Sequence, residues 1–231
     1  MAVFDLSLIT SGPYHAMLVA GLKLSLQLLG ATLLLALPLA LLVALSRLSA
    51  FRALRISAWL FVEAIRNVPL LAHMLFWYFG APELLPEASR EWLYAHNYEA
   101  IAAVAALTFY TAAYMSEDLR SGIRAIPHGQ FEASRALGFG FFRSMRLIIL
   151  PQALRVTVPP LISQTLNLWK NTSIATVIGT AELMYQAAKV ETETFRSVEA
   201  FVFATAAYLS ISLLITGLAV AYQRFYPARA V

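Results

Sequence analysis

The chain has 231 residues, of which 60% are hydrophobic and 13% are charged, and it carries a formal net charge of +4. Soluble domains are about half apolar and about one quarter charged, so this composition argues against a soluble globule and favours lipid as the solvent. The basic excess is then typical of Lys and Arg kept on the cytoplasmic side, not of a nucleic-acid-binding surface, and the lack of cysteine excludes disulfides and thiolate metal sites.

Five stretches are long and apolar enough to cross a bilayer, for which a helix needs about 20 residues. In chain order they cover about residues 17–45, 57–79, 99–115, 156–177 and 200–222. Pro69, in the second stretch, cannot donate a backbone hydrogen bond, which predicts a kink with free carbonyl groups. We therefore expect an all-α, polytopic membrane protein whose 231 residues form one transmembrane domain.

The charges between these stretches alternate in sign along the chain. Arginines dominate the segment after the first stretch, the segment after the third, and the C-terminal tail, which carries Arg224 and Arg229. Acidic residues dominate the other two segments: Glu83, Glu87, Glu91, Glu191, Glu193 and Glu199. Because basic residues are retained in the cytoplasm, the pattern predicts a cytoplasmic C-terminus and, with five spans, an N-terminus outside.

One connection, at about residues 119–151, is long for a simple loop, and such connections are usually functional. Its residues 130–137 have a helical composition, and Gly138 is suited to end that helix because glycine accepts a left-handed conformation. Four aromatic rings surround this helix, those of Phe131, Phe139, Phe141 and Phe142. Composition leaves two interpretations open: the rings form a docking surface for another protein, or they lie in the membrane interface.

The same connection contains a motif with fixed spacing. Three residues separate Glu132, Ala133 and Ser134 from Gly138, and nine more precede Ile148, Leu150 and Pro151. The pattern resembles the EAA loop of ABC importer permeases, which reads Glu-Ala-Ala, three residues, Gly, nine residues and Ile-x-Leu-Pro. Ser134 is the one departure, a small residue in place of the usual alanine.

Further segments resemble the polar amino-acid branch of that family. Residues 63–71 read Glu-Ala-Ile-Arg-Asn-Val-Pro-Leu-Leu, similar to the Glu-x-x-Arg-x-x-Pro-Leu element of the branch. Residues 116–123, 170–174, 178–179 and 182–183 are also similar, so the resemblance covers nearly the whole chain. Within the branch the chain looks most like the membrane subunits of glutamate/aspartate importers.

In the resembled family, the EAA loop forms a coupling helix that sits in a groove of a cytoplasmic ATPase. The resemblance therefore implies that the contact to the ATPase is made by Glu132, Ala133, Ser134, Gly138, Ile148, Leu150 and Pro151. The sequence has no Gly-rich phosphate-binding loop of the Walker type. We therefore expect no cofactor in this chain, with ATP and Mg²⁺ bound by the partner ATPase.

Polar residues inside the apolar stretches are candidates for a substrate pathway. Glu63 and Arg66 are three residues apart on one helical face, and Asn67 follows them. Charges within a span are costly and usually face a bundle interior or an aqueous path. The residues therefore form either a wall of the pathway or a structural Glu–Arg pair that joins helices.

Lys170, Asn171, Thr172 and Ser173 form a second polar cluster, within or near the fourth stretch. A cation with hydroxyl donors can hold the carboxylate of an amino acid. Alternatively, Lys170 snorkels to the outer interface. Relatives in the resembled family that carry cationic or neutral amino acids often have an acid where this chain has Asn171, so its absence favours an anionic or neutral substrate.

The sequence gives no support for an enzyme or a metal site. Its four histidines are scattered, no His/Asp/Glu group has metal-ligand spacing, and no nucleophile–base arrangement is evident. We expect a transport subunit without catalytic residues. His73, inside the second stretch, is expected to be a satisfied histidine of the helix bundle.

The residues and the resemblance together imply the membrane-spanning permease subunit of an ATP-driven importer of the bacterial inner membrane. Its substrate is expected to be a polar amino acid, with glutamate or aspartate favoured. The implied partners are a cytoplasmic ATPase dimer, a second permease subunit, identical or paralogous, and an extracytoplasmic amino-acid-binding protein. Two alternatives stay open: another polar amino acid, or a solitary ion-coupled carrier in which Glu63 is a proton or cation site.

Overall fold

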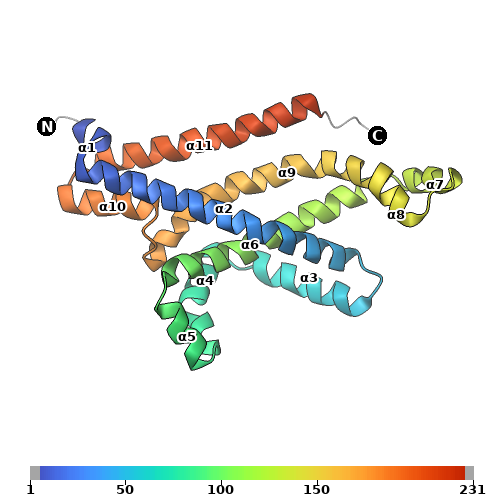
Figure 1. Ribbon diagram of the computed structural model, residues 1–231, viewed down its shortest axis with the longest axis horizontal. Helices are drawn as coiled ribbons and strands as arrows, with labels where there is room; N and C mark the ends of the chain where they lie inside the picture. Colours follow the sequence, from blue (N-terminus) through green and yellow to red (C-terminus); the bar gives the residue numbers. More distant parts are fainter. Residues whose placement is uncertain (1–5, 227–231) are drawn as a thin grey trace.

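The computed structural model describes residues 6–226, and every regular element in that range is helical (Figure 1). The longer helices are α2 (Gly12–Leu48), α3 (Arg52–Arg66), α6 (Tyr98–Arg124), α9 (Leu150–Asn171) and α11 (Ser197–Phe225). The shorter elements are α1 (Leu6–Thr10), α4 (Leu70–Leu75), η1 (Phe76–Gly80), η2 (Ala81–Leu84), α5 (Glu87–Tyr94), α7 (His128–Ala136), α8 (Phe141–Ser144), η3 (Met145–Ile149), η4 (Thr172–Ile178) and α10 (Leu183–Thr194). The all-α prediction is confirmed; Arg229, used above for orientation, lies outside the described residues.

Three of the predicted spans coincide with helices that are long and apolar enough to cross a membrane. These helices are Gly12–Leu48, Phe141–Ile178 and Ser197–Phe225, and they contain the first, fourth and fifth predicted spans. Large apolar side chains on α2 and α11 are exposed, including Leu34 and Leu213. Such surfaces suit lipid, so the prediction of a multi-pass membrane protein is confirmed.

The second predicted span is broken in two. The axis of α3 and that of residues 70–84 differ by 103°, so the kink predicted at Pro69 is present and is sharp enough to divide the stretch 57–79 into two helices. Pro69 is the cause, as expected, because it has no N–H for the carbonyl of Ile65, four residues earlier. That carbonyl oxygen lies instead 3.0 Å from Nε2 of His73, which donates to it. His73 is therefore a satisfied histidine of the bundle.

The third predicted span, residues 99–115, lies within α6, which has 27 residues and a length of about 40 Å. α6 lies between α2 and α9 in the middle of the bundle (Figure 1). It is not among the described helices that are apolar enough to count as a crossing helix. A helix enclosed by other helices can bury small and polar side chains where a lipid-facing helix carries leucine. The count of five spans and the orientation stay predictions.

Small residues let the helices of the bundle approach one another closely. Ala36 and Ala40 of α2 are fully buried against Ala112 and Met115 of α6. At Gly21 of α2, an added Cβ would stand 2.8 Å from a side-chain carbon of α10. Close backbone approach increases van der Waals contact, which stabilises helix pairs in a lipid environment.

The connection at residues 119–151 is mostly helical, which corrects its description as a long loop. α6 continues to Arg124, α7 follows, and α8 and the π-helical turn η3 run directly into α9. Only residues 125–127 and 137–140 of this connection lie outside helices. As a result, α7 and α8 lie at one end of the long axis of the molecule, opposite α1 and α10 (Figure 1).

Candidate functional site

The end of α7 has the backbone structure that the sequence predicts. Gly138 has φ +77°, and its N–H donates to the carbonyl of Arg135 at 2.9 Å. The N–H of Phe139 donates to the carbonyl of Ser134 at 3.0 Å. These two bonds form a Schellman motif, in which a left-handed glycine ends the helix. A short helix with a fixed end is thereby presented at one end of the molecule.

The first three motif residues divide between two sides of α7. Glu132 and Ala133 are exposed. Ser134 is buried, and its hydroxyl donates to the carbonyl of Phe131 at 2.8 Å. The alanine expected at position 134 would fit the same buried place, which explains why a small residue is suited there. Of these three residues, Glu132 and Ala133 are therefore the ones available to another protein.

The second half of the motif joins α7 to the start of α9. Ile148 is partly buried against an apolar cluster that includes Ile149, and Phe131 of α7 packs on the same cluster. Leu150 and Pro151 are exposed in the first turn of α9. The apolar contacts hold α7 against the end of α9.

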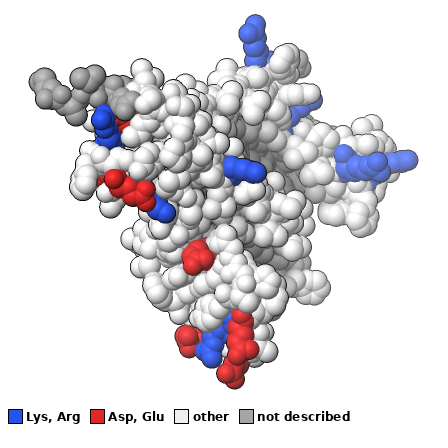
Figure 2. Space-filling view, turned by 60° about the vertical axis from the view of Figure 1, so that its left-hand side comes forward, with Lys and Arg blue, Asp and Glu red and all other residues white. Residues whose placement is uncertain are grey.

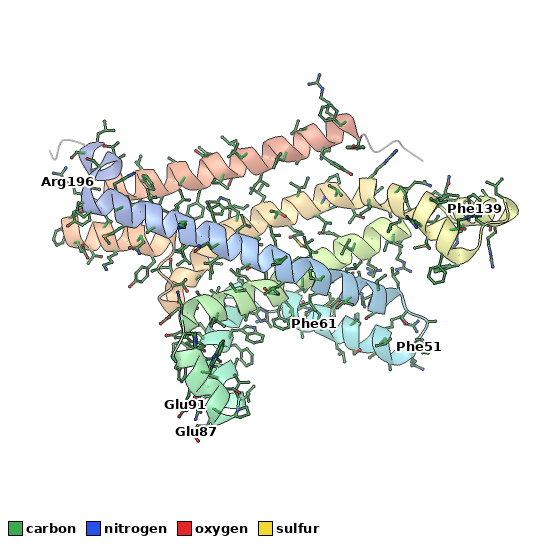
Figure 3. The ribbon with its side chains drawn as sticks, viewed as in Figure 1. Phe51, Phe61, Glu87, Glu91, Phe139 and Arg196 are labelled. Atoms are coloured by element: carbon green, nitrogen blue, oxygen red, sulfur yellow. The ribbon has the colours of Figure 1, made fainter. Side chains whose placement is uncertain are left out.

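The surface beside α7 is hollow, aromatic and basic. A hollow of about 540 Å³ lies between α7 and α8. Phe141 and Phe142 are 69% and 86% exposed, and the guanidinium carbon of Arg143 lies 5.7 Å from the ring centre of Phe139. Figure 3 shows Phe139 at this end of the molecule and Arg196 at the opposite end. Exposed rings with a cation suit contact with another protein, and they equally suit the membrane interface, so both interpretations of the sequence stay open.

A polar groove of about 420 Å³ runs between α6 and α9. Its lining residues are Tyr110, Thr111, Tyr114, Gln164, Asn167, Leu168, Lys170 and Asn171. The two tyrosine hydroxyls are 3.4 Å apart. The lining therefore offers one ammonium group, hydroxyls and amides, which suits a small polar solute with a negative group.

Arg66 is the last residue of α3, directly before the break in the second predicted span, and its side chain extends toward this groove. Its guanidinium carbon lies 4.9 Å from the ring centre of Tyr114, a cation–π contact. Asp118, one turn further along α6, lies against Gln164 and near the positive charge of Arg66. One carboxylate oxygen of Asp118 is buried without a hydrogen-bond partner in the described part of the chain. Asp118 was not singled out from the sequence, although it stands inside the similar segment 116–123.

The other residues predicted for the pathway lie elsewhere. Glu63 is exposed on α3, and its carboxylate accepts a hydrogen bond from Asn67 at 3.0 Å; the ion pairs within residues 6–226 do not include Glu63 with Arg66. Thr172 is buried and donates to the carbonyl of Trp169 at 2.8 Å. Ser173 donates to the carbonyl of Lys170 at 2.8 Å. The structure thus brings Arg66, Lys170 and Asn171 toward one groove, but not Glu63, Thr172 and Ser173.

A second polar centre, which sequence reasoning missed, surrounds Glu182. This carboxylate has no exposed surface, and it accepts hydrogen bonds from the hydroxyls of Ser25, Tyr208 and Thr176 and from the N–H of Tyr185. The donors come from α2, α11, η4 and α10. Glu182 belongs to a pair of residues, 182–183, noted as similar to the family, and that was its only signal in the sequence.

Charges are sparse on the face drawn in Figure 2, where small basic and acidic groups are scattered over a mostly uncharged surface and a mixed cluster lies on the lowest projection. At the tip of the projecting α5, Glu87 and Glu91 point outward (Figure 3). Arg90 pairs with Glu83 at 3.2 Å beside them. Away from α5, Glu117 of α6 pairs with Arg47 of α2 at 3.2 Å, and this ion pair joins the two helices.

One family profile, described as "Binding-protein-dependent transport system inner membrane component", matches residues 36–226. This range includes all the residues that line the groove. It also includes all the motif residues, which lie within residues 128–151; we call these residues the α7 segment. A match over most of the chain shows membership of the family.

Several amino-acid permeases are similar in sequence. The probable glutamine ABC transporter permease protein GlnM of Bacillus subtilis is 39% identical over 171 residues, covering 74% of this chain and 75% of that protein. The glutamate/aspartate import permease protein GltJ of Escherichia coli is 38% identical over 160 residues, covering 68% of this chain and 65% of that protein. The arginine transport system permease protein ArtQ of Bacillus subtilis is 31% identical over 213 residues, covering 92% of this chain and 93% of that protein.

Solved structures with the same architecture include a crystal structure of an amino acid ABC transporter with histidines. It has a TM-score of 0.83 and 30% identity, covering 97% of this chain and 99% of that chain. An inward-facing MetNI methionine ABC transporter has a TM-score of 0.69 at 20% identity, a likeness of fold alone. The resemblance to ABC importer permeases is thereby confirmed, and the chain belongs to the family of binding-protein-dependent transport system inner membrane components.

Proposed function

We propose that this chain is the permease subunit of an ATP-driven importer of polar amino acids in the bacterial inner membrane, and that the groove between α6 and α9 is part of its substrate path. The observation that carries the proposal is the convergence of Lys170 and Arg66 with tyrosine hydroxyls and amides at one groove of about 420 Å³. The names of the relatives support it, since they refer to glutamine, glutamate/aspartate and arginine.

The charges of the groove favour a substrate with a negative or amide side chain. Lys170, in the lining of the groove, offers a partner for a carboxylate. The residues that line the groove include no acid that would attract a second positive charge. Glutamate and aspartate therefore fit first, glutamine fits second, and arginine is disfavoured.

The α7 segment is the proposed contact to a cytoplasmic ATPase dimer, which binds ATP and Mg²⁺, so that this chain acts as a transport subunit without a cofactor of its own. α6 and α9 each extend from this segment to the groove, so a displacement of α7 can be transmitted to the walls of the path. In this account the chain has five spans, an outer N-terminus and a cytoplasmic C-terminus, and it pairs with a second permease subunit. An extracytoplasmic binding protein delivers the amino acid.

A solitary ion-coupled carrier is less well supported. That alternative used Glu63 as an ion site, but its carboxylate is exposed and hydrogen-bonded to Asn67 on the same helix. Family membership also favours an assembly driven by a binding protein and an ATPase.

Uptake competition tests the substrate class. Cells that express the chain with its partner subunits and binding protein are given radiolabelled glutamate together with excess unlabelled aspartate, glutamine or arginine. The proposal predicts strong competition by aspartate, weaker competition by glutamine and none by arginine. Competition by arginine alone would overturn the acidic assignment, and uptake that persists without the ATPase would overturn the importer.

A further inference from the structure

The carboxylate of Glu182 is fully buried and has four hydrogen-bond donors. Ser25 and Tyr208 donate to Oε2, each at 3.0 Å, and Thr176 and the N–H of Tyr185 donate to Oε1. No ion pair within residues 6–226 involves Glu182. The four donors replace the hydrogen bonds with water that the carboxylate loses on burial. Without such donors, burial of the carboxylate would cost free energy.

The groups around this carboxylate use it as a hydrogen-bond acceptor. The hydroxyl of Ser25 donates to Glu182 and accepts a hydrogen bond from the N–H of Leu183 at 3.1 Å. The N–H of Tyr185 can only donate. Glu182 is also the N-cap of α10, a 12-residue helix whose N-terminus favours negative charge. A neutral amide at position 182 would turn an NH₂ group toward two of the donors.

A chain of contacts leads from Glu182 to the wall of the groove. Tyr208 donates its hydroxyl hydrogen to Glu182, and its carbonyl accepts the indole N–H of Trp169 at 3.1 Å. The rings of Tyr208 and Trp169 are 4.9 Å apart between centres. Trp169 is fully buried and directly precedes Lys170 and Asn171, which line the groove. The position of this end of α9 therefore depends on where Tyr208 is held.

We infer that Glu182 is a positioning residue for the groove: its buried carboxylate holds Tyr208, and through Tyr208 and Trp169 it fixes the end of α9 that presents Lys170 and Asn171. The same carboxylate also joins α11 to α2 and α10, since Tyr208, Ser25 and the N-terminus of α10 meet there. The significance for uptake rests on the proposed function, whereas the geometric role of Glu182 does not.

A labelling experiment tests the geometric role of Glu182 separately from its significance for uptake. The chain has no cysteine, so Asn171→Cys places a single thiol in the groove of the full-length protein. Its rate of modification by a water-soluble methanethiosulfonate is measured with and without Glu182→Gln, in detergent-purified protein. We expect the rate to change at least about threefold, and Glu182→Asp, which keeps the charge, to restore part of it. The matched control is Glu199→Gln, because Glu199 is also a buried acid but pairs with Arg196 outside this chain of contacts.

Uptake supplies the second readout. Glu182→Gln is expected to raise the KM for the amino acid by about tenfold with a smaller change in the maximal rate, since misplaced binding groups weaken substrate capture. If Glu182→Gln fails to fold, Tyr208→Phe removes one donor and is expected to shift both readouts in the same direction. An unchanged labelling rate at position 171 in folded Glu182→Gln would overturn the inference. A changed labelling rate, combined with no amino-acid uptake by the unsubstituted chain and its partners, would uphold the inference and overturn the proposed function.

Discussion

Gly122 of α6 lies so close to Thr157 of α9 that a Cβ atom at position 122 would stand 1.8 Å from the Thr157 hydroxyl oxygen. The hydroxyl of Thr157 is itself held, because it donates to the carbonyl of Ala153 at 2.7 Å. This contact joins α6 and α9 between the α7 segment at one end and the groove toward the other. Movement of α7 is therefore expected to act on both walls of the groove together.

Gly122→Ala should force the two helices apart. Overpacking at a close helix contact costs about 1–3 kcal/mol, so the thermal unfolding midpoint in detergent should fall. Adding Thr157→Ala should recover much of that loss by removing the hydroxyl. Gly30→Ala is the matched control, because no atom lies within 4 Å of a Cβ there. Equal midpoints for Gly122→Ala and Gly30→Ala would contradict the close contact.

His73→Phe should destabilise the broken second span. The imidazole donates to the carbonyl of Ile65 at 3.0 Å, and a typical hydrogen bond contributes about 0.5–1.5 kcal/mol to stability, so we expect a loss of about that size. Denaturant or thermal unfolding measures the loss. His96→Phe serves as the control, since His96 is exposed and such substitutions usually change stability by less than about 0.5 kcal/mol. A His73→Phe protein as stable as the control would show that the hydrogen bond contributes little.

Lys170→Gln should weaken uptake of an acidic amino acid. It removes the one ammonium group that lines the groove, and a charge-assisted hydrogen bond is about twice as strong as a neutral one. We expect the KM for glutamate to rise about tenfold or more, which corresponds to about 1.4 kcal/mol per factor of ten. Lys23→Gln, at an exposed lysine on α2, should leave the KM unchanged. Identical KM values for the two variants would remove Lys170 from the path.

Glu132→Lys should uncouple transport from ATP hydrolysis. The side chain is exposed in the middle of α7, where a reversed charge repels a complementary partner without disturbing the helix bundle. The protein should still insert into the membrane, but its uptake should fall by about tenfold or more while Glu132→Gln shows a smaller loss. Uptake and membrane content are measured in the same cells. Normal uptake by Glu132→Lys would place the ATPase contact elsewhere.

The sequence was informative where a structure depends on neighbouring residues. Long apolar stretches predicted α2 and α11 closely, and the glycine at position 138 predicted the end of α7. Pro69 predicted a kink, but the 103° angle depends on how His73 and Tyr110 pack across the break, which are tertiary contacts. The boundaries of α6 were underestimated because its last turns are polar and enclosed by other helices.

Contacts between distant residues could not be predicted in the same way. Ser25 and Glu182 are 157 residues apart, and neither has local spacing that indicates a partner. Thr172 and Ser173 looked available from composition, yet each donates to a carbonyl three residues earlier in its own turn. Arg66 reaches the groove only because the broken span brings the end of α3 beside Tyr114. Such arrangements arise from the fold and not from the local sequence.

The most direct test of the central claim is coupled transport in proteoliposomes. The chain is purified in mild detergent with all subunits that accompany it, reconstituted with ATP inside the vesicles, and supplied from outside with glutamate and its binding protein. The account predicts that an ATPase copurifies, that loaded binding protein stimulates ATP hydrolysis, and that glutamate accumulates only when ATP is present. Glutamate accumulation by the chain alone, driven by an ion gradient and indifferent to ATP, would contradict it.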